Sequence, residues 1–138
     1  MTADPDGLRF YVDESALGLG KSLAAARKDT IHVGHPLIAE CPIGTLDIDW
    51  IPAVAARELI VIARDRRIRT KPQELASFQE AGLRVFWIAG KKDMSTWEWL
   101  SRLVRNWAAI ERVIRMRGDG PWFYAVNEVG LKDIPLPS

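Results

Sequence analysis

The sequence predicts an α/β fold in which helices cover both faces of a mainly parallel sheet. Short apolar runs with many β-branched residues alternate with segments whose apolar residues recur at helical spacing. Strands that alternate with helices are normally joined by right-handed crossovers, which leave the strands parallel. The chain of 138 residues has no internal repeat, so we expect a single domain with its core at about residues 8–126 and a polar tail at 127–138.

The first half of the chain predicts three strands and two helices. Strands are expected at 8–12, 30–33 and 59–63, where Val, Ile, Phe and Tyr are concentrated. A helix is expected at about 16–27, because Leu19, Leu23 and Ala26 share one side. Residues 34–46 contain two prolines and two glycines and indicate a loop. A second helix is expected at about 49–58, with Pro52 tolerated in its first turn.

The second half predicts two helices and two strands. A helix at 72–81 is preceded by Thr70, three residues before Gln73, and is followed by Gly82. A strand at 84–88 follows. The longest helix is expected at 95–117, because Ser95 and Glu98 form a capping box and apolar residues recur until Gly118. A final strand is expected at 122–126.

Composition narrows the class of protein. Hydrophobic residues make up 48% and charged residues 27% of the chain, as in ordinary soluble domains. The lone cysteine, Cys41, excludes an internal disulfide and favours a reducing compartment. The sequence shows no signal peptide and no apolar run of the ~18 residues that a membrane span needs, so a cytoplasmic protein is expected.

Three acidic residues are placed at the edge where an open α/β sheet binds its ligands. Asp13 follows the strand 8–12, Asp65 follows the strand 59–63, and Asp47 stands where the helix between them opens. Ligands of such sheets bind in the crevice outside the carboxyl ends of the strands. Because carboxylate oxygens suit hard divalent cations such as Mg²⁺, the pattern predicts a metal site. Such a site could activate water for attack on a phosphodiester.

Other charged residues are candidate site residues, and each also has a purely structural interpretation. Asp49 is a further metal ligand or a helix N-cap, and Glu14 is a ligand or a solvated side chain. Asp65 itself could be only an ion-paired turn residue. Basic residues outnumber acidic ones after residue 60, and the cluster beside Asp65 predicts phosphate contacts or merely an exposed charged loop. The candidates for phosphate contact are Arg64, Arg66, Arg67, Arg69 and Lys71, together with Lys21 from the helix at 16–27.

Two other kinds of site have partial motifs. Gly18-Leu19-Gly20-Lys21-Ser22 looks like the end of a phosphate-binding P-loop, but Ser15 stands where that motif requires glycine. Lys21 is then a helix-surface residue close to the predicted site. His32, His35 and Cys41 would suit zinc, but the sequence offers no fourth ligand at a common spacing.

The order of these motifs resembles the PIN-domain family, and in particular the small PIN-like proteins related to VapC toxins. The resemblance rests on the strand ending in Asp13-Glu14 and on four later segments, and it covers about residues 8–126. These segments are Asp47 to Ile51, Ile60 to Arg69, Lys71 to Glu74 and Arg84 to Ala89. It implies a three-layer α/β/α sandwich, and a cluster of acidic residues that binds Mg²⁺ or Mn²⁺ and cleaves single-stranded RNA, often as a toxin silenced by an antitoxin.

Residue by residue, the resemblance assigns Asp13, Asp47 and Asp65 to the catalytic metal site. Ala63 stands where many relatives have Thr or Ser, and Arg67 stands where they have a further acid. A catalytically silent module that binds RNA or protein is therefore the alternative to a ribonuclease. Trp97, Trp99 and Trp107 give the helix 95–117 more apolar surface than one face usually buries, which predicts a homodimer or a bound antitoxin.

Overall fold

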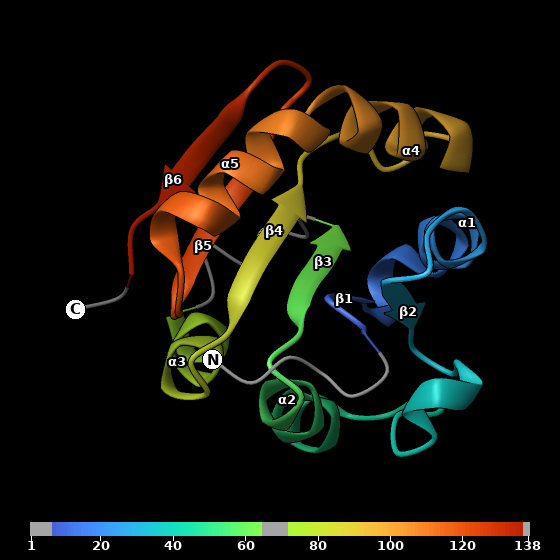
Figure 1. Cartoon of the computed structure of the whole chain (residues 1–138), viewed down its shortest axis with the longest axis vertical. Coiled ribbons are helices and arrows are strands. Elements are labelled where there is room, and N and C mark those ends of the chain that lie inside the picture. The colour runs from blue at the N-terminus through green and yellow to red at the C-terminus, as the bar shows by residue number, and fades with distance from the viewer. Residues whose placement is uncertain (1–6, 65–71, 137–138) are drawn as a thin grey trace.

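The structure is a computed structural model that describes residues 7–64 and 72–136, and these residues form one sheet between two layers of helices (Figure 1). The strands are β1 (Phe10–Val12), β2 (Thr30–His32), β3 (Ile60–Arg64), β4 (Arg84–Ile88), β5 (Trp122–Val126) and β6 (Leu131–Ile134). The helices are α1 (Leu17–Ala26), α2 (Asp47–Ala56), α3 (Pro72–Glu80), α4 (Thr96–Arg105) and α5 (Trp107–Arg117). Two short 3-10 helices, η1 (Glu14–Ala16) and η2 (Pro36–Ile38), complete the described elements. The predicted α/β fold is confirmed.

The strand order in the sheet is β2-β1-β3-β4-β5-β6. The first five strands are parallel, and β6 pairs antiparallel with β5. The chain runs outward from β1 to β2 and then returns to the other side of β1 to form β3. The strand order thus reverses between β1 and β3, which is where open α/β sheets bind their ligands.

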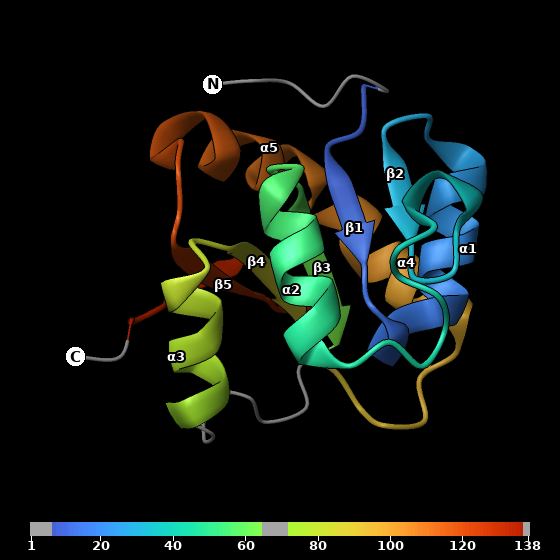
Figure 2. The ribbon, with the colours of Figure 1, turned by 90° about the horizontal axis from the view of Figure 1, so that it is seen from below.

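Helices cover both faces of the sheet, as Figure 2 shows from below. On one face, Trp50 of α2 and Phe78 of α3 pack in one apolar cluster with Tyr11 and Trp87. The other face is covered by α1, α4 and α5, whose cluster includes Phe10, Ile62, Leu19, Leu103 and Ile110. Because both faces are covered, all three residues of β1 are buried, as expected for a central parallel strand.

The predicted single helix at 95–117 is wrong, because the chain breaks between α4 and α5 at Asn106. The expected capping box is present: the Ser95 hydroxyl accepts from the Glu98 N–H, and Glu98 Oε1 accepts from the Ser95 N–H. The expected end is also present, since Gly118 has φ 65°. Asn106 escaped prediction because the apolar periodicity continues through it.

The predicted polar tail at 127–138 is also wrong, because it contains β6. Ile134 is buried in the sheet, whereas Lys132 and Asp133 are exposed. Four residues with two charges carry too weak an apolar pattern to indicate a strand, and the pairing with β5 supplies the missing stabilisation.

The helix predicted from Asp49 begins two residues earlier. Asp47 is the first residue of α2 and Leu46 occupies the N-cap position, so the N-cap interpretation of Asp49 is wrong. Pro52 consequently falls in the second turn rather than the first. The helix forgoes the hydrogen bond that a residue with an N–H would make there.

The tryptophans of α4 and α5 differ in burial. Trp99 is buried, Trp107 is half-buried and Trp97 is 75% exposed. Association through this surface stays a prediction. None of the described helices has both the length and the apolar character that crossing a membrane requires.

Candidate functional site

A cavity of about 370 Å³ lies at the carboxyl ends of β1 and β3, where the strand order reverses. Four carboxylates line it: Asp13, Glu14, Asp47 and Glu74. Its walls also include the aromatic residues Tyr11, Trp50 and Trp87. Figure 2 shows β1 and β3 pointing downward, toward the end of the molecule where the first turns of α2 and α3 lie. Residues from distant parts of the sequence therefore meet in one place.

Asp13 is held at the end of β1 by the turn that follows it. Its side chain is the N-cap of η1 and accepts hydrogen bonds from the Ser15 N–H, at 3.0 Å, and from the Ser15 hydroxyl. The same hydroxyl accepts a hydrogen bond of 3.1 Å from the backbone N–H of Arg64. Ser15 thus connects the carboxylate to the end of the neighbouring strand β3.

Asp47 is held from within its own helix. Its Oδ1 accepts a hydrogen bond of 2.8 Å from the indole N–H of Trp50. Trp50 is buried and stacks on Tyr11, with ring centroids 5.4 Å apart. The orientation of an exposed carboxylate is therefore coupled to the core, which helps to define its direction toward the cavity.

Two glutamates complete the acidic lining. Glu14 is exposed, and its Oε1 accepts a hydrogen bond of 2.5 Å from the N–H of Gly44 in the loop before α2. Glu74 lies in the first turn of α3 and is half-buried. Sequence reasoning did not select Glu74 as a site residue. The available signal was Pro72, which favours the first position of a helix and so places Glu74 one turn from the sheet edge at which β3 ends.

Three residues that line the cavity each have a buried polar atom with no hydrogen-bond partner among the described residues. These atoms are the hydroxyl of Tyr11, the indole nitrogen of Trp87 and Nε of Arg64. Burial raises the pKa of Tyr11 far above its ordinary value, and the charges of Asp13, Glu14 and Asp47 add to the rise. The phenol therefore stays neutral and remains a hydrogen-bond donor.

Arg64 connects the cavity to α4. It is the last residue of β3 and lines the cavity, while its guanidinium lies 4.6 Å from the ring centroid of Trp99. One of its Nη atoms donates to the carbonyl of Lys92 at 3.0 Å. A cation stacked on an aromatic ring keeps its charge while its orientation is restricted.

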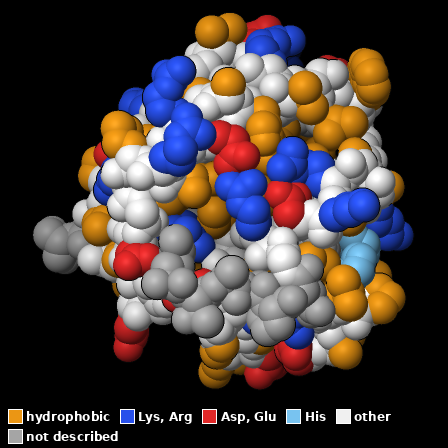
Figure 3. All heavy atoms as spheres, in the orientation of Figure 1, with side chains coloured by type: hydrophobic (Ala, Val, Ile, Leu, Met, Phe, Trp, Pro, Cys, Tyr) orange, Lys and Arg blue, Asp and Glu red, His pale blue; other side chains and the backbone are white. Residues whose placement is uncertain are grey.

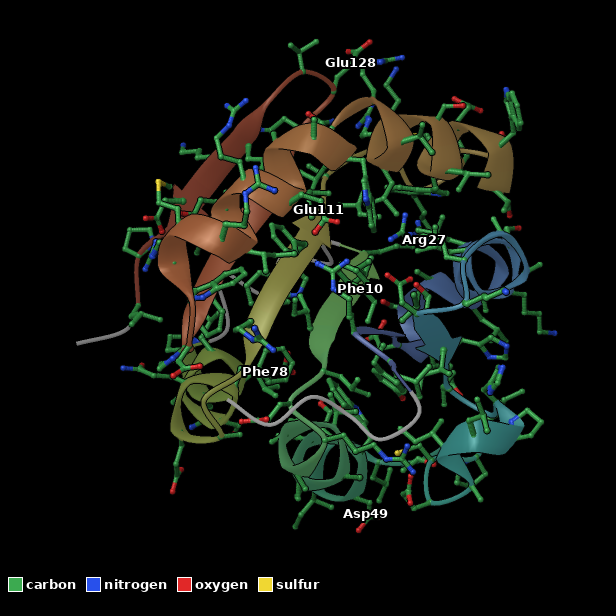
Figure 4. All side chains as sticks on the ribbon, in the orientation of Figure 1. Phe10, Arg27, Asp49, Phe78, Glu111 and Glu128 are labelled. Carbon is green, nitrogen blue, oxygen red and sulfur yellow. The ribbon has the colours of Figure 1, made fainter. Side chains whose placement is uncertain are left out.

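The remaining predicted site residues lie elsewhere or outside the described residues. Asp49 is exposed and does not line the cavity, and Figure 4 shows it projecting outward from α2. Lys21 is exposed on α1 and does not line the cavity either. The candidates that lie outside the described residues are Asp65, Arg66, Arg67, Arg69 and Lys71.

The cavity matches a divalent cation in the chemistry of its donors. Carboxylates from three elements, Asp13, Asp47 and Glu74, offer the oxygen ligands that Mg²⁺ and Mn²⁺ prefer. Within residues 7–64 and 72–136, however, no three His, Cys, Asp or Glu side chains are grouped closely enough to hold a metal ion. A complete ligand set would therefore need Asp65, a change in side-chain conformation, or ligands from water and substrate.

The alternative motifs have structural roles. Gly18 and Gly20 lie within α1, where a Cβ on Gly18 would come within 2.8 Å of Thr96 and one on Gly20 within 2.8 Å of His32. These glycines let α1 approach α4 and the sheet, and the segment forms no phosphate-binding loop. The Nδ1 of His35 accepts a hydrogen bond from the Leu37 N–H, and the described residues provide no zinc site that includes this side chain.

Comparison with protein families identifies the family of this chain. A family model described as "PIN like domain" matches residues 8–90, which is more than half of the chain and includes β1, α2, β3, α3 and β4. No curated protein and no solved structure matches the chain at the threshold applied. The matched segment contains all four carboxylates that line the cavity. The chain therefore belongs to the PIN-like domain family.

Proposed function

We propose that this protein is a metal-dependent endoribonuclease that cleaves single-stranded RNA and acts as the toxin of a toxin-antitoxin pair. The observation that carries the proposal is the meeting of Asp13, Asp47 and Glu74 in one cavity at the point where the strand order reverses. Carboxylates brought together from three separate elements repel one another, so their collection costs stability that a bound cation would restore. Membership of the PIN-like family, in which nucleases are common, supports the same activity.

Asp13, Asp47 and Asp65 would hold Mg²⁺ or Mn²⁺, with Glu74 as a fourth acid that compensates for Arg67. When bound, such an ion supplies an activated water and charge stabilisation for the phosphate. The protein's own contribution is orientation. Ser15 fixes the carboxylate of Asp13, and Trp50 fixes that of Asp47. Preoriented ligands bind a cation without first losing conformational freedom.

The test replaces Asp47 and, as a matched control, Asp49 by Asn. Both lie in the first turn of α2, but only Asp47 lines the cavity. We expect Asp47→Asn and Asp13→Asn to weaken Mn²⁺ binding by at least roughly 10- to 100-fold, the loss typical when a supporting partner of a metal is removed. RNA cleavage should fall with metal affinity, whereas Asp49→Asn should leave both unchanged. Calorimetric titration with Mn²⁺ and cleavage of a labelled single-stranded RNA measure the two effects.

Equal cleavage by the parent and Asp13→Asn proteins, purified identically, would contradict the proposal. A module that binds RNA or protein without cleaving it is then the better description. The observation that favours this second function is Arg67, which stands where many relatives have a further acid. Such a module should show no rise in melting temperature with millimolar Mg²⁺ or Mn²⁺.

The toxin role is tested separately from the chemistry. Expression of the parent protein should arrest growth, and expression of Asp13→Asn protein at the same level should not. Growth arrest by both proteins would mean that RNA cleavage at this cavity is not the cause.

A further inference from the structure

The loop that joins β4 to α4, residues 89–95, is linked to the acidic cavity through Arg64, which lines the cavity and donates to the Lys92 carbonyl. In Figure 2 this loop runs at the bottom of the view, below the carboxyl end of β3. The placement follows from the sheet, because β4 is the parallel neighbour of β3 and ends at the same edge. The family resemblance and the acidic residues gave no reason to select this segment.

Three long side chains from outside the loop hold its backbone. Arg102 donates to the carbonyl of Ala89, Arg64 donates to that of Lys92 at 3.0 Å, and the Trp99 indole donates to that of Met94 at 3.0 Å. Surface loops usually leave their carbonyls to water. Here the side chains fix the loop in one conformation.

The interior of the loop is equally restricted. The Met94 N–H bonds the Lys91 carbonyl at 3.2 Å, which closes a turn. At Gly90, a Cβ would come within 2.6 Å of the Met94 sulfur and 2.8 Å of two ring carbons of Trp99. Trp99 is buried, so this contact leaves little room for any side chain at position 90.

The fixed loop displays two unpaired cations. Lys91 and Lys92 are exposed, and neither ammonium group has a hydrogen bond or ion pair within the described part of the chain. Arg64, stacked on Trp99, adds a third positive charge. The loop also carries the exposed Asp93, and Lys91 lies close enough to Glu98 of α4 to help lower the pKa of that carboxyl. The three cations therefore exceed these two acids by one charge. The acids Asp47 and Glu74 come from the opposite side, from α2 and α3.

We propose that Lys91, Lys92 and Arg64 form a preorganised phosphate-binding lip that holds the backbone of single-stranded RNA at the cavity. This inference rests on the proposed function and names the residues that bind its substrate. A cavity lined by carboxylates repels phosphates, so neighbouring cations are needed to keep the strand in place. Because the loop is already fixed, little entropy is lost when RNA binds to it.

The test compares two double variants that remove the same charge. Lys91→Gln with Lys92→Gln removes the lip lysines. Lys28→Gln with Lys132→Gln removes two exposed lysines at other places, of which Lys28 precedes β2 at the opposite edge of the sheet. Binding of a fluorescent oligouridine is measured by anisotropy in EDTA, over a range of salt concentrations. EDTA prevents metal-dependent cleavage, so binding is measured alone.

We expect the lip variant to bind more weakly at low salt and to lower the slope of log K against log salt by about 1.4, since each phosphate contact contributes about 0.7 in single strands. The control variant should keep the parent's slope. Equal slopes for the parent and the lip variant would overturn the proposal, as would an equal loss in both double variants.

A third variant tests preorganisation without changing charge. Gly90→Ala forces the loop away from Trp99, so RNA binding should weaken several-fold while Lys91 and Lys92 remain. Parent-like binding by Gly90→Ala would overturn the role of the fixed loop.

Different results would refute the lip and the proposed function. If the parent cleaves RNA but the lip variant keeps the parent's salt slope, only the lip is refuted. A lip-dependent slope without cleavage in Mg²⁺ or Mn²⁺ refutes the nuclease and leaves an RNA-binding lip.

Discussion

The hydroxyl groups of Tyr11 and Tyr124 lie in two different environments. Both rings are buried, but the Tyr124 hydroxyl accepts a hydrogen bond of 2.8 Å from Arg117, whereas the Tyr11 hydroxyl has no partner among the described residues. An unsatisfied buried polar group costs about 1–3 kcal/mol. The fold tolerates this cost at the wall of the acidic cavity, where strained or unsatisfied groups commonly mark function.

We expect Tyr11→Phe to leave the free energy of unfolding unchanged or to raise it by up to about 1–2 kcal/mol, because it removes an unsatisfied group. Tyr124→Phe makes the same chemical change at a satisfied hydroxyl and should lower the free energy of unfolding by about 1 kcal/mol. Urea denaturation followed by tryptophan fluorescence measures both. A loss of stability in Tyr11→Phe as large as in Tyr124→Phe would show that Tyr11 has a partner in solution.

At the scale of elements, Asn106 joins the α4–α5 break to the turn between β5 and β6. Its amide nitrogen donates to the carbonyls of Arg102, at 2.8 Å, and Asn127, at 3.0 Å. Its amide oxygen accepts from the Gly130 N–H at 2.8 Å. The buried side chain of Asn106 thus makes three hydrogen bonds to backbone groups.

Replacing Asn106 by Leu keeps the volume but leaves the Asn127 carbonyl and the Gly130 N–H without this partner. We expect the free energy of unfolding to fall by about 2–6 kcal/mol, the sum of two unsatisfied groups at about 1–3 kcal/mol each. Asn127→Ala is the control, because Asn127 takes part through its backbone only. Denaturant unfolding gives the energies, and faster hydrogen exchange at Gly130 should accompany the loss. Unchanged exchange at Gly130 would contradict this role.

At the scale of the molecule, an ion-pair network joins the start of β1 to α5 and to the turn after α1. Arg9 binds Glu111 at 2.5 Å and Asp29 at 3.3 Å, and Arg27 binds Asp29 at 2.7 Å while its guanidinium lies 4.5 Å from the Trp107 ring. Figure 3 shows acidic side chains flanked by Lys and Arg in the middle of this face, and Figure 4 shows Glu111 and Arg27 there. The hydrogen bond from Arg9 holds the pKa of Glu111 below its ordinary value of 4.5.

This shift has a definite sign in the dependence of stability on pH. A carboxyl whose pKa is lower in the folded than in the unfolded protein stabilises the fold above the unfolded pKa. That contribution is lost as the pH falls through the folded pKa. We expect Glu111→Gln to cost about 1 kcal/mol at pH 7, and the difference from the parent should shrink progressively below pH 4.5. Urea denaturation across this pH range measures it.

Glu128→Gln serves as the control for this network. The ion pair of Glu128 with Arg105 has a separation of 4.0 Å and is largely exposed on both sides. Exposed pairs of this kind contribute little, so this variant should match the parent at every pH. If the loss of unfolding free energy in Glu111→Gln stayed the same at low pH, the variant would have lost packing and not a charge interaction.

Local sequence patterns sufficed for the elements whose signals lie within a few residues. The capping box at Ser95, the helix ends at Gly82 and Gly118, and the five parallel strands are of this kind. Alternation of strands and helices also placed Asp13 and Asp47 at one sheet edge in advance, because parallel strands have only one carboxyl edge. Whether these acids hold a metal stays a prediction.

Only the tertiary structure decided the features that depend on contacts between distant residues. Asn106 breaks a helix because its partners are Asn127 and Gly130, and β6 is a strand because β5 lies beside it. Glu74 joins the cavity because α3 starts at the edge where β1 and β3 end. Apolar periodicity indicates which face of an element is buried, but it does not indicate which polar groups of distant residues contact that element. The sequence by itself therefore determined the α/β fold and the placement of Asp13 and Asp47 at one sheet edge. Tertiary contacts decided the wall of the cavity and the conformation of the loop at 89–95.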